Sequence, residues 1–307
     1  MSLLVFGTGG QLGQEIGDAT ARRNVPAVLL TRADADIADR ASVVAAVTRA
    51  KPTVVVNAAA YTKVDKAEDE SDRAFRENRD GPALLAEVCA AHGLPLIHVS
   101  TDYVFDGTKV GPYVEADPVA PLGIYGASKE AGEQAIRARL DRHVILRTAW
   151  VYGVHGNNFL KTMLNLARSR DSWGVVMDQR GNPTATADIA DAILAAAARA
   201  RDGTAAWGTY HFAGTGAASW HDFACEIVTA QSRFTGRQPE VKAITTADYP
   251  TKARRPVNSC LDSAYFAAAF QVTARPWAER TRDVVATLLS PPAAAESASA
   301  SASERGN

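Results

Sequence analysis

The sequence lacks the features that would tie it to a membrane, to nucleic acid or to an oxidising compartment. It contains no apolar run approaching the roughly 20 residues that cross a bilayer, and its first six residues are too short for a signal peptide. A net charge of −1 gives no attraction to nucleic acid. Its three cysteines are far apart and form no CxxC pair, which argues against a disulfide framework or a metal site. We therefore expect a cytoplasmic protein with neither a membrane nor a nucleic-acid partner.

The first half of the chain alternates short apolar runs with helical patterns. Strands are expected at Leu3–Phe6, Ala27–Leu30, Val54–Val56, Leu96–Val99 and Val144–Leu146. Helices are expected at Leu12–Arg22, Ser42–Ala50, Leu84–His92 and Glu130–Arg139. Apolar strands between helices indicate a parallel sheet covered on both faces. Residues 1–150 are thus predicted to form an α/β, Rossmann-type doubly wound sheet that binds a dinucleotide.

The pattern loosens after Trp150. Helices are expected at Asn158–Ser169, Asp188–Ala200 and Ala218–Ala230, the last capped by Ser219, and a late strand at Tyr210–Phe212. Residues 151–290 are predicted to form mainly a smaller C-terminal substrate-binding lobe, with some segments returning to the sheet. Residues 291–307 consist mostly of Pro, Ala, Ser and Glu, a composition typical of a disordered tail.

A glycine loop joins the first strand to the first helix. Gly7, Gly10 and Gly13 give the spacing GxxGxxG. Glycine permits a tight turn and close approach of a pyrophosphate, while the helix N-terminus offers free N–H groups and a positive dipole end. The alternative is a purely structural turn, but the strand–turn–helix context favours a dinucleotide site.

Residues that follow the second and third strands bear on which dinucleotide binds. The second strand ends in Thr31-Arg32 instead of the acidic residue that usually binds the ribose 2′-OH of NAD. Because arginine pairs well with a 2′-phosphate, NADPH is favoured, with NADH as an alternative. The loop at Asp36-Ile37 lies where it would cover the adenine. Small residues after the third strand, ending in Ala60-Tyr61-Thr62, allow a cofactor to approach that edge of the sheet.

A tyrosine and a lysine four residues apart form the catalytic candidate. On a helix, Tyr125 and Lys129 lie on one face. An ammonium nearby is expected to lower the tyrosine pKa, so that the phenol can donate a proton to a carbonyl oxygen as hydride arrives at the carbon. YxxxK alone also occurs on ordinary surface helices. Here Ser100-Thr101-Asp102 follows the fourth strand, and a hydroxyl at that sheet edge would bind the same carbonyl.

Together these motifs resemble the extended short-chain dehydrogenase/reductases, and within them the dTDP-4-dehydrorhamnose reductase branch. The matching runs are Val56–Thr62, Val64–Glu68, Ser100–Phe105, Arg147–Tyr152, Gly156–Phe159, Asp178-Gln179, Pro183-Thr184, Ser219–Asp222, Arg255-Pro256 and Asn258-Ser259. They extend the resemblance over essentially residues 1 to 285.

The resemblance implies an NAD(P)H-dependent reduction of the C4 ketone of dTDP-6-deoxy-L-lyxo-4-hexulose to dTDP-L-rhamnose. It implies a catalytic set of Tyr125 as proton donor, Lys129 as its support and Thr101 as the group that tunes its pKa. Cofactor contacts are implied at Gly10, Gln11, Leu12, Asp36, Ile37, Ala60, Tyr61, Thr62, Tyr125 and Lys129. Substrate contacts are implied at Thr101, Asp102, Trp150, Asn158 and Arg255, the last two toward the diphosphate.

The resemblance also bears on a metal and on assembly. Some members are dimers bridged by magnesium on glutamates, and Glu15 matches one such position. Ala187 stands where a second glutamate is expected, and Asp188 is displaced by one residue. We therefore expect no metal and leave a homodimer open. Two other functions also stay open: a reductase of another dTDP-4-keto-6-deoxysugar, and a non-catalytic regulatory subunit on the same fold, like that of methionine adenosyltransferase.

Overall fold

Six parallel strands form the centre of the computed structural model, which describes residues 2–290. They are β1 (Leu3–Phe6), β2 (Ala27–Leu30), β3 (Val54–Asn57), β4 (Leu96–Thr101), β5 (His143–Thr148) and β10 (Gly208–His211). Their spatial order is β10-β5-β4-β3-β1-β2. The order reverses between β1 and β3, and a crevice at such a switch point is where ligands bind in open α/β sheets.

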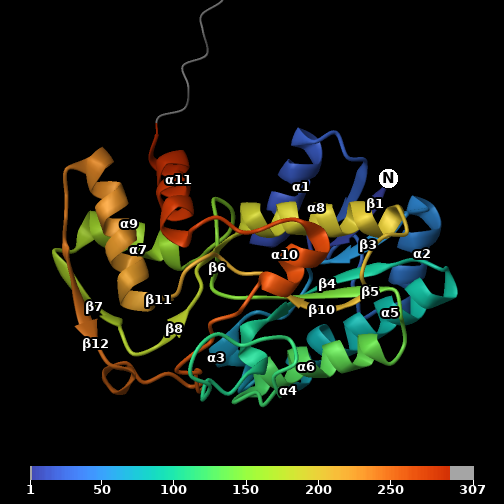
Figure 1. Ribbon diagram of the computed structural model, residues 1–307, viewed down its shortest axis with the longest axis horizontal. Helices are drawn as coiled ribbons and strands as arrows, with labels where there is room; N and C mark the ends of the chain where they lie inside the picture. Colours follow the sequence, from blue (N-terminus) through green and yellow to red (C-terminus); the bar gives the residue numbers. More distant parts are fainter. Residues whose placement is uncertain (1, 291–307) are drawn as a thin grey trace, which may run out of the picture.

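Helices cover both faces of this sheet, as Figure 1 shows. One face carries α1 (Gln11–Arg22), α8 (Thr186–Arg201) and α10 (Ala264–Phe270), and the other carries α2 (Arg40–Ala50), α5 (Gly81–Ala91) and α6 (Ile124–Arg137). Side chains alternate along β1 to serve both layers, with Leu3 and Val5 in one apolar cluster and Leu4 and Phe6 in the other. All four are fully buried, which explains why the strand reads as continuously apolar.

A second group of elements lies beside the sheet, at the left of Figure 1. Its helices are α7 (Phe159–Ser169), α9 (Trp220–Thr235) and α11 (Trp277–Leu289). Its strands form three short pairs: β7 (Ser172–Val176) with β12 (Glu240–Ile244), β6 (Val151–Tyr152) with β9 (Thr184–Ala185), and β8 (Arg180–Gly181) with β11 (Ala218–Ser219). These elements share an apolar cluster of their own that includes Leu160, Trp173, Phe223 and Val285.

Short helices surround the carboxyl edge of the sheet. They are α3 (Val64–Ala67), α4 (Ser71–Phe75), the π-helix η1 (Arg76–Asp80) and the 3₁₀ turns η2 (Asp102–Val104) and η3 (Thr246–Asp248). A π-helical turn is rare and occurs preferentially at functional sites. Here it lies between α4 and α5 and packs against α6.

The predicted doubly wound sheet is confirmed, with differences at element ends. β4 extends two residues further, to Thr101, and the late strand begins earlier than predicted and ends at His211. The helix expected from Glu130 begins instead at Ile124, so Tyr125 and Lys129 both lie inside α6. Ser219 caps α9 as predicted, in a capping box with Asp222. The predicted tail, 291–307, lies outside the described residues, and within 2–290 no helix is long and apolar enough to cross a membrane.

Candidate active site

The glycine loop forms a tight cradle between β1 and α1. A Cβ atom on Gly7 would lie 2.4 Å from the Ala59 backbone nitrogen, and one on Gly13 would lie 2.3 Å from the Gly7 carbonyl oxygen. Gly7 also has a φ of +89°, which favours glycine. Gly10 is the N-cap residue of α1 and provides no side-chain cap. The first-turn N–H groups of this helix are thus suited to bind an anion.

Gln11 and Leu12 follow the loop and point in different directions. The Gln11 amide donates to the Val151 carbonyl at 3.3 Å and accepts from the Asn158 amide at 3.3 Å. Leu12 is buried in the apolar cluster beneath α1, so only its backbone can contact a ligand. Asn158 also caps α7 through the Lys161 N–H. The glycine loop is therefore hydrogen-bonded to the segment that enters the second group of elements.

Thr101 and Tyr125 meet at the end of β4. The Thr101 hydroxyl donates to Asp102 Oδ1 at 3.0 Å, and the Thr101 side chain acts on the Tyr125 phenol by lowering its pKa. The Tyr125 ring packs edge-on against Tyr103, with centroids 5.5 Å apart. This approach requires Gly126, because a Cβ there would lie 2.1 Å from the Tyr103 carbonyl oxygen. The glycine within YGASK is thus explained by the close contact of α6 with the turn after Thr101.

Lys129 is buried one helical turn after Tyr125 and is only 2% exposed. Its Nζ donates to the Val99 carbonyl oxygen at 2.6 Å and lies 3.4 Å from His98 Nε2. Burial lowers the pKa of Lys129 to about 8, against a raising effect of Glu133. Because the amine is turned toward β4, it does not act on the phenol.

The predicted direction of the Tyr125 pKa is therefore wrong for this structure. Burial raises the pKa of Tyr125 to about 12, against the Thr101 side chain, which lowers it, while the Asp102 charge raises it further. Asp102 itself is buried, and burial raises its pKa to about 6. Its Oδ2 has no hydrogen-bond partner among the described residues. A polar group that is buried without a partner is costly, and this oxygen is suited to accept from a ligand hydroxyl.

Charged side chains occupy the end of β2. Arg32 Nη1 donates to Glu77 Oε1 at 2.7 Å, and Arg76 from the π-helix pairs with Asp36 at 2.9 Å. Arg32 remains 54% exposed, so its guanidinium is available to a phosphate. Ile37, by contrast, packs in the apolar cluster on the α2–α5 face. The loop at Asp36 is thus held by ion pairs that the sequence spacing did not reveal.

Asn78 fixes the segment that follows β3. Its Oδ1 accepts from the Tyr61 N–H at 2.8 Å, and its Nδ2 donates to the Tyr61 carbonyl at 3.0 Å and to Ser128 Oγ at 3.0 Å. The π-helix thereby joins Tyr61 to the helix that carries Lys129. Tyr61 is buried, whereas its neighbour Ala60 is half-buried and Thr62 is exposed.

Trp150 lies just past β5 in a left-handed backbone conformation, with a φ of +47°. Its indole stacks on Trp220, with ring centroids 3.6 Å apart and planes 4° apart. The same indole also lies against Gly181, where a Cβ would come within 2.3 Å of it. Left-handed backbone in a bulky residue is rare and concentrates at functional sites.

Arg255 binds a carboxylate of the short helix α3. Its Nη1 and Nη2 donate to the two oxygens of Asp65 at 3.1 and 2.8 Å, and the Ala253 N–H donates to the same side chain. The Asp65 pair with Arg255 lowers the pKa of that carboxyl. This bidentate contact crosses from the sheet-side helix α3 to the C-terminal segment, and Lys252 pairs with Asp69 beside it.

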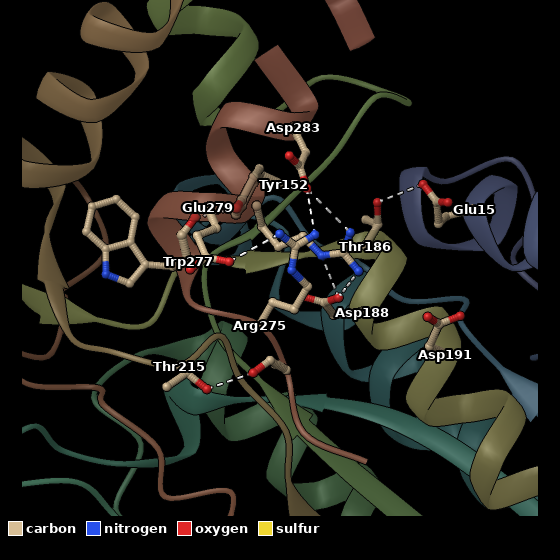
Figure 2. Close-up of polar contacts among 12 residues, drawn as sticks. Glu15, Tyr152, Thr186, Asp188, Asp191, Thr215, Arg275, Trp277, Glu279 and Asp283 are labelled. Atoms are coloured by element: carbon tan, nitrogen blue, oxygen red, sulfur yellow. Dashed lines mark hydrogen bonds and ion pairs between the residues drawn. The ribbon is translucent and has the colours of Figure 1, made fainter. Parts of the chain in front are cut away.

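Glu15 and Asp188 lie on the α1–α8 side, where Figure 2 shows Glu15 hydrogen-bonded to Thr186. Glu15 accepts from the Thr186 hydroxyl at 3.1 Å and pairs with Arg22 at 3.4 Å. Asp188 pairs with Arg280. Among residues 2–290 no group of three or more His, Cys, Asp or Glu side chains is arranged to hold a metal ion.

A separate cavity of about 710 Å³ lies beyond the β8–β11 pair. Arg180, Asn182, Asn258 and Cys260 contribute to its lining, and Thr101, Tyr125 and Lys129 do not. The catalytic candidates therefore lie at the sheet edge and not in this cavity.

The sheet order, the glycine cradle and the Thr101–Tyr125–Lys129 group define a nicotinamide-dependent oxidoreductase of the extended short-chain dehydrogenase/reductase class. The family model of the RmlD substrate binding domain matches residues 1–290, and the chain therefore belongs to that family within the class.

Two curated relatives are named dTDP-4-dehydrorhamnose reductase. The one from Sinorhizobium fredii is 44% identical over 94% of this chain and 98% of its own, and the one from Aggregatibacter actinomycetemcomitans is 43% identical over 92% and 97%. A crystal structure of the Clostridium acetobutylicum reductase has a TM-score of 0.86 at 38% identity and covers 94% of this chain and 99% of its own. The Bacillus anthracis reductase in complex with NADP has a TM-score of 0.86 at 32% identity, over 92% and 98%.

Several side chains around the site were not predicted from the sequence. They are Asp65, Asn78, His98 and Trp220. Asp65 and Trp220 lie in runs that carry the family resemblance, which was the available signal for them. Asn78 and His98 lie outside those runs.

Proposed function

We propose that this protein reduces the C4 ketone of dTDP-6-deoxy-L-lyxo-4-hexulose, that is dTDP-4-dehydro-L-rhamnose, to dTDP-L-rhamnose. The observation that carries the proposal is the grouping of Thr101, at the end of β4, with Tyr125 and the buried Lys129 of α6. The choice of this sugar nucleotide as substrate is supported by the names of the two curated relatives. NADPH is the preferred coenzyme and NADH a second one, supported by Arg32 at the end of β2 and by the NADP complex of the Bacillus anthracis relative.

The residues present fit a dinucleotide. The cradle at Gly7 and Gly13, which a Cβ would fill, and the uncapped first turn after Gly10 suit a pyrophosphate. When bound, the nicotinamide supplies the hydride for the ketone carbon. Gln11 holds the loop against the Val151 segment, and the exposed Arg32 guanidinium suits a 2′-phosphate.

Tyr125 is the proton donor. A pKa of about 12 keeps its phenol protonated at neutral pH, as a general acid requires. As the new C–H bond forms, the phenol proton moves to the carbonyl oxygen, which leaves a secondary alcohol on the sugar and a phenolate on the enzyme. Thr101 lowers the pKa of the phenol, and the ammonium of Lys129 compensates the phenolate once the amine turns from Val99 toward the site.

The substrate lobe is proposed to come mainly from residues 151–290. Trp150, stabilised by its stack on Trp220, would form a wall of the sugar site, and the free Asp102 oxygen would accept from a sugar hydroxyl. Arg255 would bind the diphosphate by exchanging Asp65 for phosphate oxygens, and Asn158 would line the path between lobe and loop. A cytoplasmic location is supported by the three free cysteines.

Turnover of the sugar nucleotide tests the proposal. Purified protein is expected to oxidise NADPH when given the 4-keto-L-sugar nucleotide, followed by absorbance of the reduced coenzyme. Tyr125→Phe should lower kcat by about 100-fold or more at unchanged NADPH affinity, because it removes only the proton donor. Tyr265→Phe is the matched control, since Tyr265 is 55% exposed on α10, and its activity should equal that of the wild type.

The same assay separates the alternatives. Preferred turnover of the epimeric keto-sugar would assign the enzyme to another dTDP-4-keto-6-deoxysugar. Coenzyme binding without turnover of either sugar nucleotide would refute the reductase and favour a regulatory subunit.

A further inference from the structure

A buried histidine contacts the amine of Lys129, and the reaction proposed above does not use it. His98 lies in the middle of β4 with 0% exposure, and its Nε2 is 3.4 Å from Lys129 Nζ. Its other ring nitrogen, Nδ1, is 3.0 Å from the amide nitrogen of Asn57, which is also fully buried at the end of β3. Asn57, His98 and Lys129 therefore form a continuous chain across two neighbouring strands and α6.

The orientation of the Asn57 amide follows from its backbone partner. The Ala59 N–H donates to Asn57 Oδ1 at 3.0 Å, and a backbone N–H can only donate. The amide nitrogen of Asn57 must then face His98 Nδ1, where it can only donate as well. Nδ1 is thus an acceptor, which puts the ring proton of neutral His98 on Nε2.

We propose that His98, which Asn57 holds in the Nε2–H tautomer, is a positioning residue for Lys129. Its Nε2–H disfavours the ammonium in the inward position beside β4, so that the ammonium turns outward to the cofactor ribose and Tyr125. The uncharged amine fits the inner position, because it donates to the Val99 carbonyl and accepts from His98 Nε2–H. The ammonium has only donors, so two N–H groups would face each other there. Outside, ribose hydroxyls and the phenol oxygen offer it acceptors.

The charges around the pair agree with this assignment. Burial and the neighbouring Lys129 hold the pKa of His98 well below its ordinary value, so the ring is neutral at physiological pH. His143 from β5 acts in the same direction. Glu133 favours the ammonium from one turn along α6, but its carboxylate is bound by Arg147 at 2.7 Å.

The tautomer is measured directly by nitrogen NMR of histidine-labelled protein without cofactor. The chain has six histidines, and the signal lost in His98→Gln assigns the one of interest. We expect a neutral ring protonated on Nε2 between about pH 6 and 9. A ring protonated on Nδ1, or an imidazolium at neutral pH, overturns the proposal. This measurement needs no variant to remain folded except the one used for assignment.

Asn57→Asp should reverse the tautomer of His98 with almost no change in the shape of the side chain at position 57. One carboxylate oxygen still accepts from the Ala59 N–H, while the other requires a proton on His98 Nδ1, so Nε2 becomes an acceptor for the ammonium. NADPH affinity in the wild type should fall as pH rises through the Lys129 titration. In Asn57→Asp this midpoint should move up by about one pH unit or more, because an added negative charge favours the ammonium. His92→Gln, a histidine outside the site on the C-terminus of α5, should leave the midpoint unchanged.

The affinity experiment rests on the proposed coenzyme role of Lys129, whereas the NMR experiment does not. If the wild type binds no NADPH at any pH, the proposed function fails and the tautomer alone decides the inference. If Asn57→Asp moves the ring proton to Nδ1 but leaves the midpoint in place, His98 does not act on Lys129 and the inference is wrong.

Discussion

Replacing Glu133 by glutamine should unfold this protein more readily than most single substitutions, because Glu133 neutralises a buried arginine. Arg147 on β5 is 3% exposed, and its Nε and Nη2 donate to Glu133 at 3.0, 3.2 and 2.7 Å. Ser100 donates to the same carboxylate at 2.5 Å, and Arg137 at 3.0 Å. Glutamine keeps the shape but removes the charge and turns one acceptor into a donor.

The size of the stability loss follows from the Arg147 charge that the substitution leaves uncompensated. Removing one partner of a buried ion pair costs about 3–5 kcal/mol, since the other charge is left uncompensated. Glu130 Oε2 lies 3.8 Å from Arg147 and would take over part of the compensation. We therefore expect a loss of about 3 kcal/mol in the free energy of unfolding, at the lower end of that range.

Urea unfolding followed by fluorescence measures this loss, and a double variant provides the control. Arg147→Met together with Glu133→Gln removes the stranded charge, so the pair should cost less than the sum of the single changes. A loss below about 1 kcal/mol for Glu133→Gln, or strict additivity in the double variant, would refute the reasoning.

Acid should weaken the same interaction. The Arg147 charge and its hydrogen bonds hold the pKa of Glu133 well below the ordinary 4.5, although burial alone would raise it. A lowered pKa in the folded state contributes stability that is complete above the unfolded value and is lost as pH falls below it. The free energy of unfolding should therefore decline below about pH 4.5 in the wild type, and less steeply in Glu133→Gln.

Three further outcomes are expected. Gly13→Ala should abolish NADPH binding measured by fluorescence, because its Cβ would lie 2.3 Å from the Gly7 carbonyl oxygen. Gly9→Ala is the control and should bind normally, because no atom lies within 4 Å of a Cβ there. Equal NADPH affinities of the two variants would contradict the role of the glycine loop in binding. Arg32→Ala should raise the KM for NADPH by about tenfold and leave that for NADH nearly unchanged, and a parallel loss for both would speak against a 2′-phosphate contact. EDTA should leave turnover unaffected, because Arg280 pairs with Asp188; inactivation that magnesium reverses would refute this.

The fold was predictable because its strands are short, buried on both faces and separated by helices. The grouping of Thr101 with Tyr125 and Lys129 was predictable because Tyr125 and Lys129 are four residues apart and Thr101 ends a strand. The direction of the tyrosine pKa was not, since it depends on burial and on Lys129 turning toward Val99. Both are properties of the packed structure and not of the spacing in the sequence.

Contacts between distant segments were equally out of reach. Asp65 and Arg255 are 190 residues apart. The sequence around Arg255 does not indicate whether its guanidinium binds a carboxylate of the protein or a phosphate. The stack of Trp150 on Trp220 and the parallel pairing of β7 with β12 are of the same kind. Periodicity reports which face of an element is buried and leaves its partner unspecified.

The last strand of the sheet has a consequence for how the chain folds during synthesis. β10 pairs with β5 along Val144–Arg147, yet it follows β5 by some sixty residues. Until Gly208–His211 has left the ribosome, β5 is an open edge whose N–H and C=O groups are free to pair with another chain. The helix α8, which covers α1 and part of the same core, also arrives late. The nascent first half is therefore the stage at which this protein is most exposed to aggregation.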